Sequence, residues 1–351
     1  MVDIEEIKVK NVKNIEYWRD RRSVRIASHW KKADTVQNRL IKEYSNAQVD
    51  ITGEIEKLYG RYAGKTGMTY TEATKYLNGK EVASFQSKIA KLKDTWIETG
   101  DPTAYKQYKA IATRKRITRL EALNTNINFR LSELGGYQSE VMEKSLVGIY
   151  QDNFSRSIYE VNKGTGYTSS FAQIDEAQIK KIIQAPMPIT GSGLSESIWG
   201  NVDNLSRTIK QELIKGSMAG DSIQKMSKRI ATKTSTAMKN ATRLVRTETA
   251  YVIGQSDLDA YNEMGVEKYQ YFATLDDRTA EIDGSLDGEI FPVKDAAPGV
   301  NYYPMHPNCR CDAVPYIDDK YSERVARDVK TGKSVAIDGN ITYTEWKKLV
   351  A

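Results

Sequence analysis

The feature that most constrains the fold is a change in the spacing of apolar residues near Gly265. Before it, apolar residues recur three or four positions apart, which is the period of an amphipathic helix. After it, apolar and polar residues alternate, as they do in half-buried strands. Long helices are predicted at 14–48 and from about 235 to 264, with Gly265 just past a helix end. Short strands are predicted at 268–276, 288–293 and 311–317.

We therefore expect a mainly α protein with a small C-terminal α+β domain, in which long amphipathic helices precede a compact unit of helix and short strands. The segment 186–196 is rich in Pro, Gly and Ser and predicts a linker. The predicted parts are an elongated basic helical domain at 1–185, the linker at 186–196, the α+β domain at 197–318 and a C-terminal extension at 319–351. Gly135 and Gly136 also predict a break between helices at 102–133 and 136–162.

The helix predicted at 14–48 carries aromatic and charged residues on one face. Trp18, Arg22 and Trp30 recur at helical spacing, and tryptophans in such a pattern usually pack against other elements. His29 has no second metal-binding side chain near it in sequence. We expect it to be an ordinary helix residue.

Charge is distributed unevenly along the chain, although the formal net charge is only +6. Residues 1–150 carry 27 Lys and Arg against 19 Asp and Glu, whereas residues 251–351 carry 11 against 18. A basic body of this kind fits a polyanion or an acidic protein surface as partner, or is simply a solvated helical surface. No apolar run is long enough to span a membrane. Two cysteines and no apolar signal segment predict synthesis in a reducing cytoplasm.

Residues 305–311, MHPNCRC, contain both cysteines of the chain and one of its two histidines. We call this segment the knuckle. Prolines are expected to keep it extended, so that Cys309 and Cys311 point to one face and Arg310 to the other. We expect Arg310 to pair with Glu248 or Asp276.

Four segments occur in a specific order: RTETAYVIGQ at 246–255, YFATLDDRTAEIDGSLDGEIF at 271–291, the knuckle, and TYTEWKK at 342–348. Together they resemble the phage minor head proteins, the Mu F-like head morphogenesis family. The resemblance covers residues 195–318, and the helical N-terminal half agrees in architecture alone. It implies a minor structural component of a tailed-phage virion, at the portal vertex or in the head interior, that acts in head assembly and in DNA packaging or ejection. The implied partners are the portal protein, the major capsid or scaffold protein, and packaged double-stranded DNA.

This chain departs from the family pattern at two positions that bear on metal binding. Relatives carry D-x-R-T-C-x-x-C in the second segment, and here Ala280 and Asp283 stand where those cysteines would be. The groups that remain for a structural zinc are Asp283, His306, Cys309 and Cys311. We expect instead a knuckle that needs no cofactor, with zinc as the alternative. The residues expected to support it are Arg246, Glu248, Asp276, Arg278, Pro307 and Arg310.

No convincing catalytic arrangement is present in the sequence, and we expect a protein that is not an enzyme. A cysteine hydrolase needs a histidine oriented toward the thiolate, which the prolines near His306 disfavour. Arg246, Ser235 and Thr236 occur in the wrong order for an ADP-ribosyltransferase. The alternatives are a non-specific DNA-binding protein, and a toxin-like transferase or cysteine hydrolase.

Overall fold

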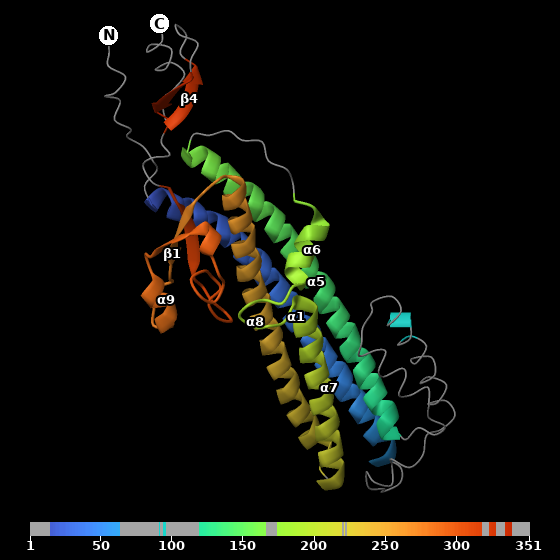
Figure 1. Ribbon diagram of the computed structural model, residues 1–351. Helices are drawn as coiled ribbons and strands as arrows, with labels where there is room; N and C mark the ends of the chain where they lie inside the picture. Colours follow the sequence, from blue (N-terminus) through green and yellow to red (C-terminus); the bar gives the residue numbers. More distant parts are fainter. Residues whose placement is uncertain are drawn as a thin grey trace, which may run out of the picture. The chain divides into compact units, whose positions relative to one another are not determined.

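The computed structural model describes residues 15–63, 119–165, 174–219, 221, 223–317, 323–327 and 334–338, together with residues 91, 94 and 95 (Figure 1). Helices dominate it. They are α1 (Ile15–Ala63), α5 (Arg119–Thr165), α6 (Glu176–Gln184), α7 (Leu194–Ala219), α8 (Ile223–Glu263) and the short α9 (Glu281–Leu286), with a 3-10 turn, η2, at Val293–Asp295. Within the described part of the chain, no helix combines the length and apolar character that crossing a membrane requires.

The strands follow the helices, as the change in residue spacing predicts. They are β1 (Lys268–Phe272), β2 (Ile290–Pro292), β3 (Asp312–Tyr316), β4 (Glu323–Arg327) and β5 (Ser334–Asp338). The first three form an antiparallel sheet in the order β2-β1-β3, in which Tyr269 lies opposite Phe291 and Pro315. β4 and β5 pair separately in a hairpin that the sequence analysis did not predict. The predicted fold class, mainly α with a small C-terminal α+β domain, is confirmed.

Two compact units divide the chain, and each is assembled from separate segments. Unit 1 comprises residues 1–33, 145–191 and 246–351, and unit 2 comprises 34–144 and 192–245. α1, α5 and α8 each contribute residues to both units. The segment 186–196 is also not an open linker throughout, since Met187 is buried.

Unit 2 has a core made from one apolar stripe on each of four helices. Residues three and four apart along a helix share a face, so the stripes of α1, α5, α7 and α8 can meet. The buried members include Tyr44, Ile51, Ile55, Leu131, Leu134, Val202, Ile209, Leu213, Met226 and Ile230.

α5 runs without interruption through Gly135 and Gly136, so the predicted helix break is wrong. Gly135 is buried, and a Cβ atom there would lie 2.5 Å from Cζ3 of the Trp199 ring. The glycine therefore provides room for an aromatic ring at a point where two helices pack closely. It does not end the helix.

Unit 1 has a core rich in tyrosine, in which the small sheet packs on the C-terminal half of α8. Tyr269 and Tyr302 meet edge to face, with ring centroids 4.9 Å apart. The Tyr302 hydroxyl donates a hydrogen bond to the Gly254 carbonyl at 3.2 Å. A Cβ atom at Gly254 would lie 3.1 Å from the Tyr303 carbonyl, so the glycine permits this close approach.

α8 begins at Ile223, upstream of the predicted start, and ends as predicted at Gly265. Gly265 has a φ of 66°, and Val266 N donates to the Tyr261 carbonyl at 2.8 Å. These are features of a helix end closed by a left-handed residue. The turn directs the chain into β1.

Candidate functional site

The knuckle contains a tight turn where the sequence predicted an extended segment. Cys309 N donates to the His306 carbonyl at 3.1 Å, with Pro307 second and Asn308 third in the turn. Asn308 has a φ of 64°, which asparagine tolerates better than most residues. Asn308 N also donates to Thr247 Oγ1 of α8 at 3.1 Å, and this bond fixes the turn to the helix.

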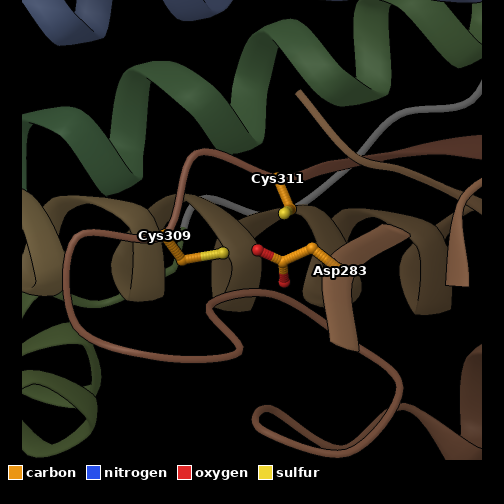
Figure 2. Close-up of side chains that lie close together, drawn as sticks. All are labelled: Asp283, Cys309 and Cys311. Carbon is orange, nitrogen blue, oxygen red and sulfur yellow. The ribbon is translucent and has the colours of Figure 1, made fainter. Parts of the chain in front are cut away.

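The two knuckle sulfurs face a carboxylate from α9 (Figure 2). Ligand atoms of Asp283, Cys309 and Cys311 all lie within 4.8 Å of one another, and all three residues are buried. The two cysteines are free thiols. The structure thus brings together side chains that the sequence separates by more than twenty residues.

His306 completes this group of side chains. Its Nε2 lies 2.8 Å from Asp283 Oδ2, and its Nδ1 donates to the Pro307 carbonyl at 2.9 Å in the tautomer that suits a carbonyl partner. Partial burial alone lowers the pKa of His306, but the hydrogen bonds to the Pro307 carbonyl and to Asp283 outweigh burial and raise it. Three of the four predicted metal-ligating residues, Asp283, Cys309 and Cys311, therefore form one cluster, and His306 joins it through Asp283.

The two thiols share hydrogen bonds within the cluster. The hydrogen bond from Cys311 lowers the pKa of the Cys309 thiol to about 7, against the opposing effect of burial. The same bond, together with burial, raises the pKa of Cys311. Tyr271, on β1, donates its hydroxyl to Asp283 Oδ1 at 3.2 Å and lies beside the Cys311 sulfur.

Arg310 points away from the sulfurs and binds Asp276 through two hydrogen bonds of 2.5 and 2.7 Å. Of its two expected partners, the structure pairs Arg310 with Asp276. The side chains of this pair are 28% and 30% exposed. Arg278 N donates to Asp276 Oδ1 at 2.9 Å, so the carboxylate is fixed by its own loop as well.

Comparison with known proteins assigns residues 207–314 to the family described as Phage Mu protein F like protein. This range contains all of α8, β1, α9, β2 and the knuckle, and β3 as far as Val314. The minor head protein GP7 of Bacillus phage SPP1 is 25% identical over 327 residues, which are 89% of this chain and 92% of that protein. Residues 207–314 therefore form a Mu F-like segment, and most of the chain is similar to a phage minor head protein.

Two further relatives match over parts of their own lengths. An NAD(+)–arginine ADP-ribosyltransferase EFV of Enterococcus faecalis is 24% identical over 68% of this chain and 50% of that protein. An uncharacterised protein of Haemophilus influenzae is 27% identical over 34% of this chain and 26% of that protein. This chain thus spans half of the transferase and about a quarter of the Haemophilus protein. No solved structure is significantly similar to it.

Inside the Mu F-like segment, Arg246 and Glu248 of the RTET sequence lie two positions apart on α8. Residues two apart on a helix do not face each other. Arg246 lies over the Trp30 ring, 5.0 Å from its centroid. Glu248 is buried, its Oε1 has no hydrogen-bond partner among the described residues, and burial raises its pKa to about 8.

A buried ionic cluster, which the residue spacing did not predict, joins α1 to the Mu F-like segment. Arg22 donates to Asp257, Asp312 and Tyr303, and Arg25 Nη2 lies 3.2 Å from Asp257 Oδ1. Burial alone would raise the pKa of Asp257, but the two arginines outweigh burial and lower it. One sequence signal could have indicated this cluster. Arg22 is a charged residue on the same helix face as Trp18, which is buried, and a charged side chain on a buried face needs a partner of opposite charge.

His29 is also more constrained than an ordinary helix residue. It is fully buried, and its Nε2 lies 3.0 Å from Asp152 Oδ2. Burial lowers its pKa to about 4, against the opposing effect of Asp152, so the ring is neutral at physiological pH. Its role here is packing with one polar contact.

Proposed function

We propose that this chain is a minor structural component of a tailed-phage head. The observation that carries the proposal is the match to the SPP1 minor head protein, which extends over 89% of this chain and 92% of that protein. The match includes the N-terminal helices as well as the Mu F-like segment, so it relates whole chains. Similarity to this family supports a structural role in the head.

In this proposal the chain resides in the virion, at the portal vertex or in the head interior, and binds the portal protein. It contacts the major capsid or scaffold protein during assembly and takes part in the packaging or ejection of DNA. Exposed basic side chains on α1, including Lys31, Arg39 and Lys42, support an acidic protein surface or DNA as the contact.

Co-purification with the portal protein of the same phage tests the proposed partner. A variant with Lys31, Arg39 and Lys42 replaced by Glu is expected to bind the portal more weakly, while the exposed neutral substitution Asn38→Ala leaves binding unchanged. Particles that lack the chain are expected to be defective in assembly or in DNA content. Absence of portal binding, together with normal particles in the deletion, would reject the proposal.

Non-specific DNA binding is a second candidate, supported by the excess of Lys and Arg before residue 251. Binding of this kind has dissociation constants of about 10⁻⁴–10⁻⁶ M, and its affinity falls steeply with salt because phosphate contacts release counterions. Titration of duplex DNA at several salt concentrations measures the slope. Salt-independent binding, or no binding in dilute buffer, would exclude this function.

We propose further that the chain is not an enzyme. The ADP-ribosyltransferase relative has half of its length outside the match, which leaves room for its named activity in the unmatched half. The Cys309 thiol is buried and its neighbour His306 turns Nε2 to Asp283, which does not suit a cysteine hydrolase. Incubation with NAD and an arginine acceptor, and with esters and peptides, is expected to give no turnover. Turnover that Cys309→Ala abolishes would contradict this.

A further inference from the structure

We propose that Asp283, His306, Cys309 and Cys311 bind one zinc ion, which holds the knuckle against α9. The carboxylate and the two sulfurs already lie within 4.8 Å of one another, and the imidazole Nε2 lies 2.8 Å from the carboxylate. Ligands arranged tetrahedrally around zinc lie about 3 to 4 Å apart, because the bonds are about 2.0–2.3 Å long. The carboxylate and the two sulfurs must move closer together to form the site, and His306 is positioned beside them by its contact with Asp283. The inference does not depend on the proposed function.

The orientation of His306 is the first independent support. A histidine that binds a metal through one nitrogen usually donates the other N–H to a carbonyl or carboxylate. Here Nδ1 lies 2.9 Å from the Pro307 carbonyl, so Nε2 is the nitrogen left for a ligand. In that tautomer Nε2 and Asp283 Oδ2 both direct lone pairs into the 2.8 Å between them. A cation, either a proton or a metal ion, must compensate them.

The burial of Asp283 is the second support. Asp283 is only 3% exposed. Burying a carboxylate lowers the stability of the fold unless a positive charge and hydrogen bonds compensate it. Among the described residues, no lysine or arginine ion pair reaches it. The side chains that contact it are His306 and Tyr271, whose hydroxyl donates to Oδ1 at 3.2 Å. Tyr271 thus orients the carboxylate so that Oδ2 stays directed at the cluster.

The ligand set determines which metal fits. Two thiolates and an imidazole favour zinc, whereas magnesium and calcium prefer oxygen ligands alone. Four protein ligands leave no open position, which is the arrangement of a structural site and not of a catalytic one. The tight turn at Pro307 and Asn308 brings the backbone of Cys309 back to the His306 carbonyl, and Cys311 follows two residues later.

Elemental analysis of the full-length chain tests the site directly. The protein is purified without a histidine tag and without chelator, and zinc is measured per chain. We expect one zinc per chain and a lower melting temperature after EDTA treatment that added zinc restores. Replacement by cobalt is expected to give the near-ultraviolet charge-transfer band of thiolate ligation and the visible spectrum of a tetrahedral site.

Ligand variants separate metal binding from simple packing. Cys311→Ser and Asp283→Ala are expected to lose the bound zinc, and Cys311→Ser to weaken the cobalt–thiolate band. The matched control is Arg310→Ala, which alters the same segment on its opposite face and is expected to retain zinc. Tyr271→Phe removes only the hydroxyl and is expected to weaken zinc affinity by about 10- to 100-fold.

A gain-of-affinity variant keeps the inference falsifiable if the ligand deletions fail to fold. Asp283→Cys replaces a hard ligand by a thiolate and is expected to bind zinc more tightly than the natural chain. Folded protein without zinc, whose melting is the same with and without EDTA, would overturn the inference. A Cys309–Cys311 disulfide in protein made in a reducing cytoplasm would also overturn the inference. The same holds if Asp283→Cys binds zinc with the affinity of the natural chain.

Discussion

Arg22 and Arg310 each bind a carboxylate, but water screens the two ion pairs to different extents. Arg22 and Asp257 are fully buried, whereas Arg310 and Asp276 are partly exposed to water. Removing one partner of a buried pair leaves an uncompensated charge, at a cost of about 3–5 kcal/mol. We expect Arg22→Ala to lower the free energy of unfolding by about that amount, and Arg310→Ala to lower it far less. Urea denaturation of both variants measures the difference, and equal losses would contradict it.

Glu248 gives a pH dependence with a definite sign. Its pKa is about 8 in the folded chain, above the ordinary value of 4.5, so the folded state holds a proton that the unfolded state releases. The associated stability is fully present below about pH 4.5 and is lost as pH rises through 8. By pH 7 the loss is about 3 kcal/mol, at 1.36 kcal/mol for each pH unit.

We therefore expect Glu248→Gln to gain stability relative to the natural chain as pH rises from 5 to 8. Denaturant titrations at several pH values measure the difference. Glu263→Gln, at an exposed position of the same helix, serves as the control. A difference between Glu248→Gln and the natural chain that does not change with pH would show that Glu248 ionises normally in the fold.

At the scale of elements, the adjacent glycines of α5 give a matched pair of substitutions. Alanine is a better helix former than glycine by about 1 kcal/mol. At Gly136 a Cβ atom meets nothing within 4 Å, so Gly136→Ala is expected to stabilise the protein by up to that amount. At Gly135 the new Cβ would lie 2.5 Å from the Trp199 ring, and overpacking costs about 1–3 kcal/mol.

Gly135→Ala is therefore expected to destabilise the protein despite its better helix propensity. Thermal melting of the two variants side by side is the measurement. Stabilisation by both substitutions would mean that Trp199 moves away without cost.

The same elements show what the sequence could predict. The sheet was predictable because alternation at 268–276 and 288–293 is a local signal, and so was the end of α8 at Gly265. The continuity of α5 could not be predicted, because the role of Gly135 depends on Trp199, which lies 64 positions away in the sequence. For the site, the sequence named the four candidate ligands. It could not give the turn at Asn308 or the contact between His306 and Asp283, which depend on how α9 and the knuckle pack.

For the whole molecule, the discontinuous units lead us to expect that the predicted α+β domain, residues 197–318, does not fold alone. Residues 197–318 include Asp257 and Asp312 but lack Arg22 and Arg25, which compensate Asp257 in the buried cluster. We expect this fragment to show no cooperative melting transition, whereas the full chain does. A fragment that melts cooperatively near the temperature of the full chain would contradict the shared unit and support the predicted boundary at 186–196.

The bond between Arg22 and Asp312 joins residues 290 positions apart, and this has a consequence for biosynthesis. At about 5–20 residues per second, a ribosome needs about 15–60 s to reach Asp312 after it has made Arg22. During that interval Arg22 has emerged without the carboxylates that later surround it. A chain whose translation stops early lacks Asp312 altogether, so truncated copies are expected to remain open to cellular proteases and to be removed before they can enter a particle.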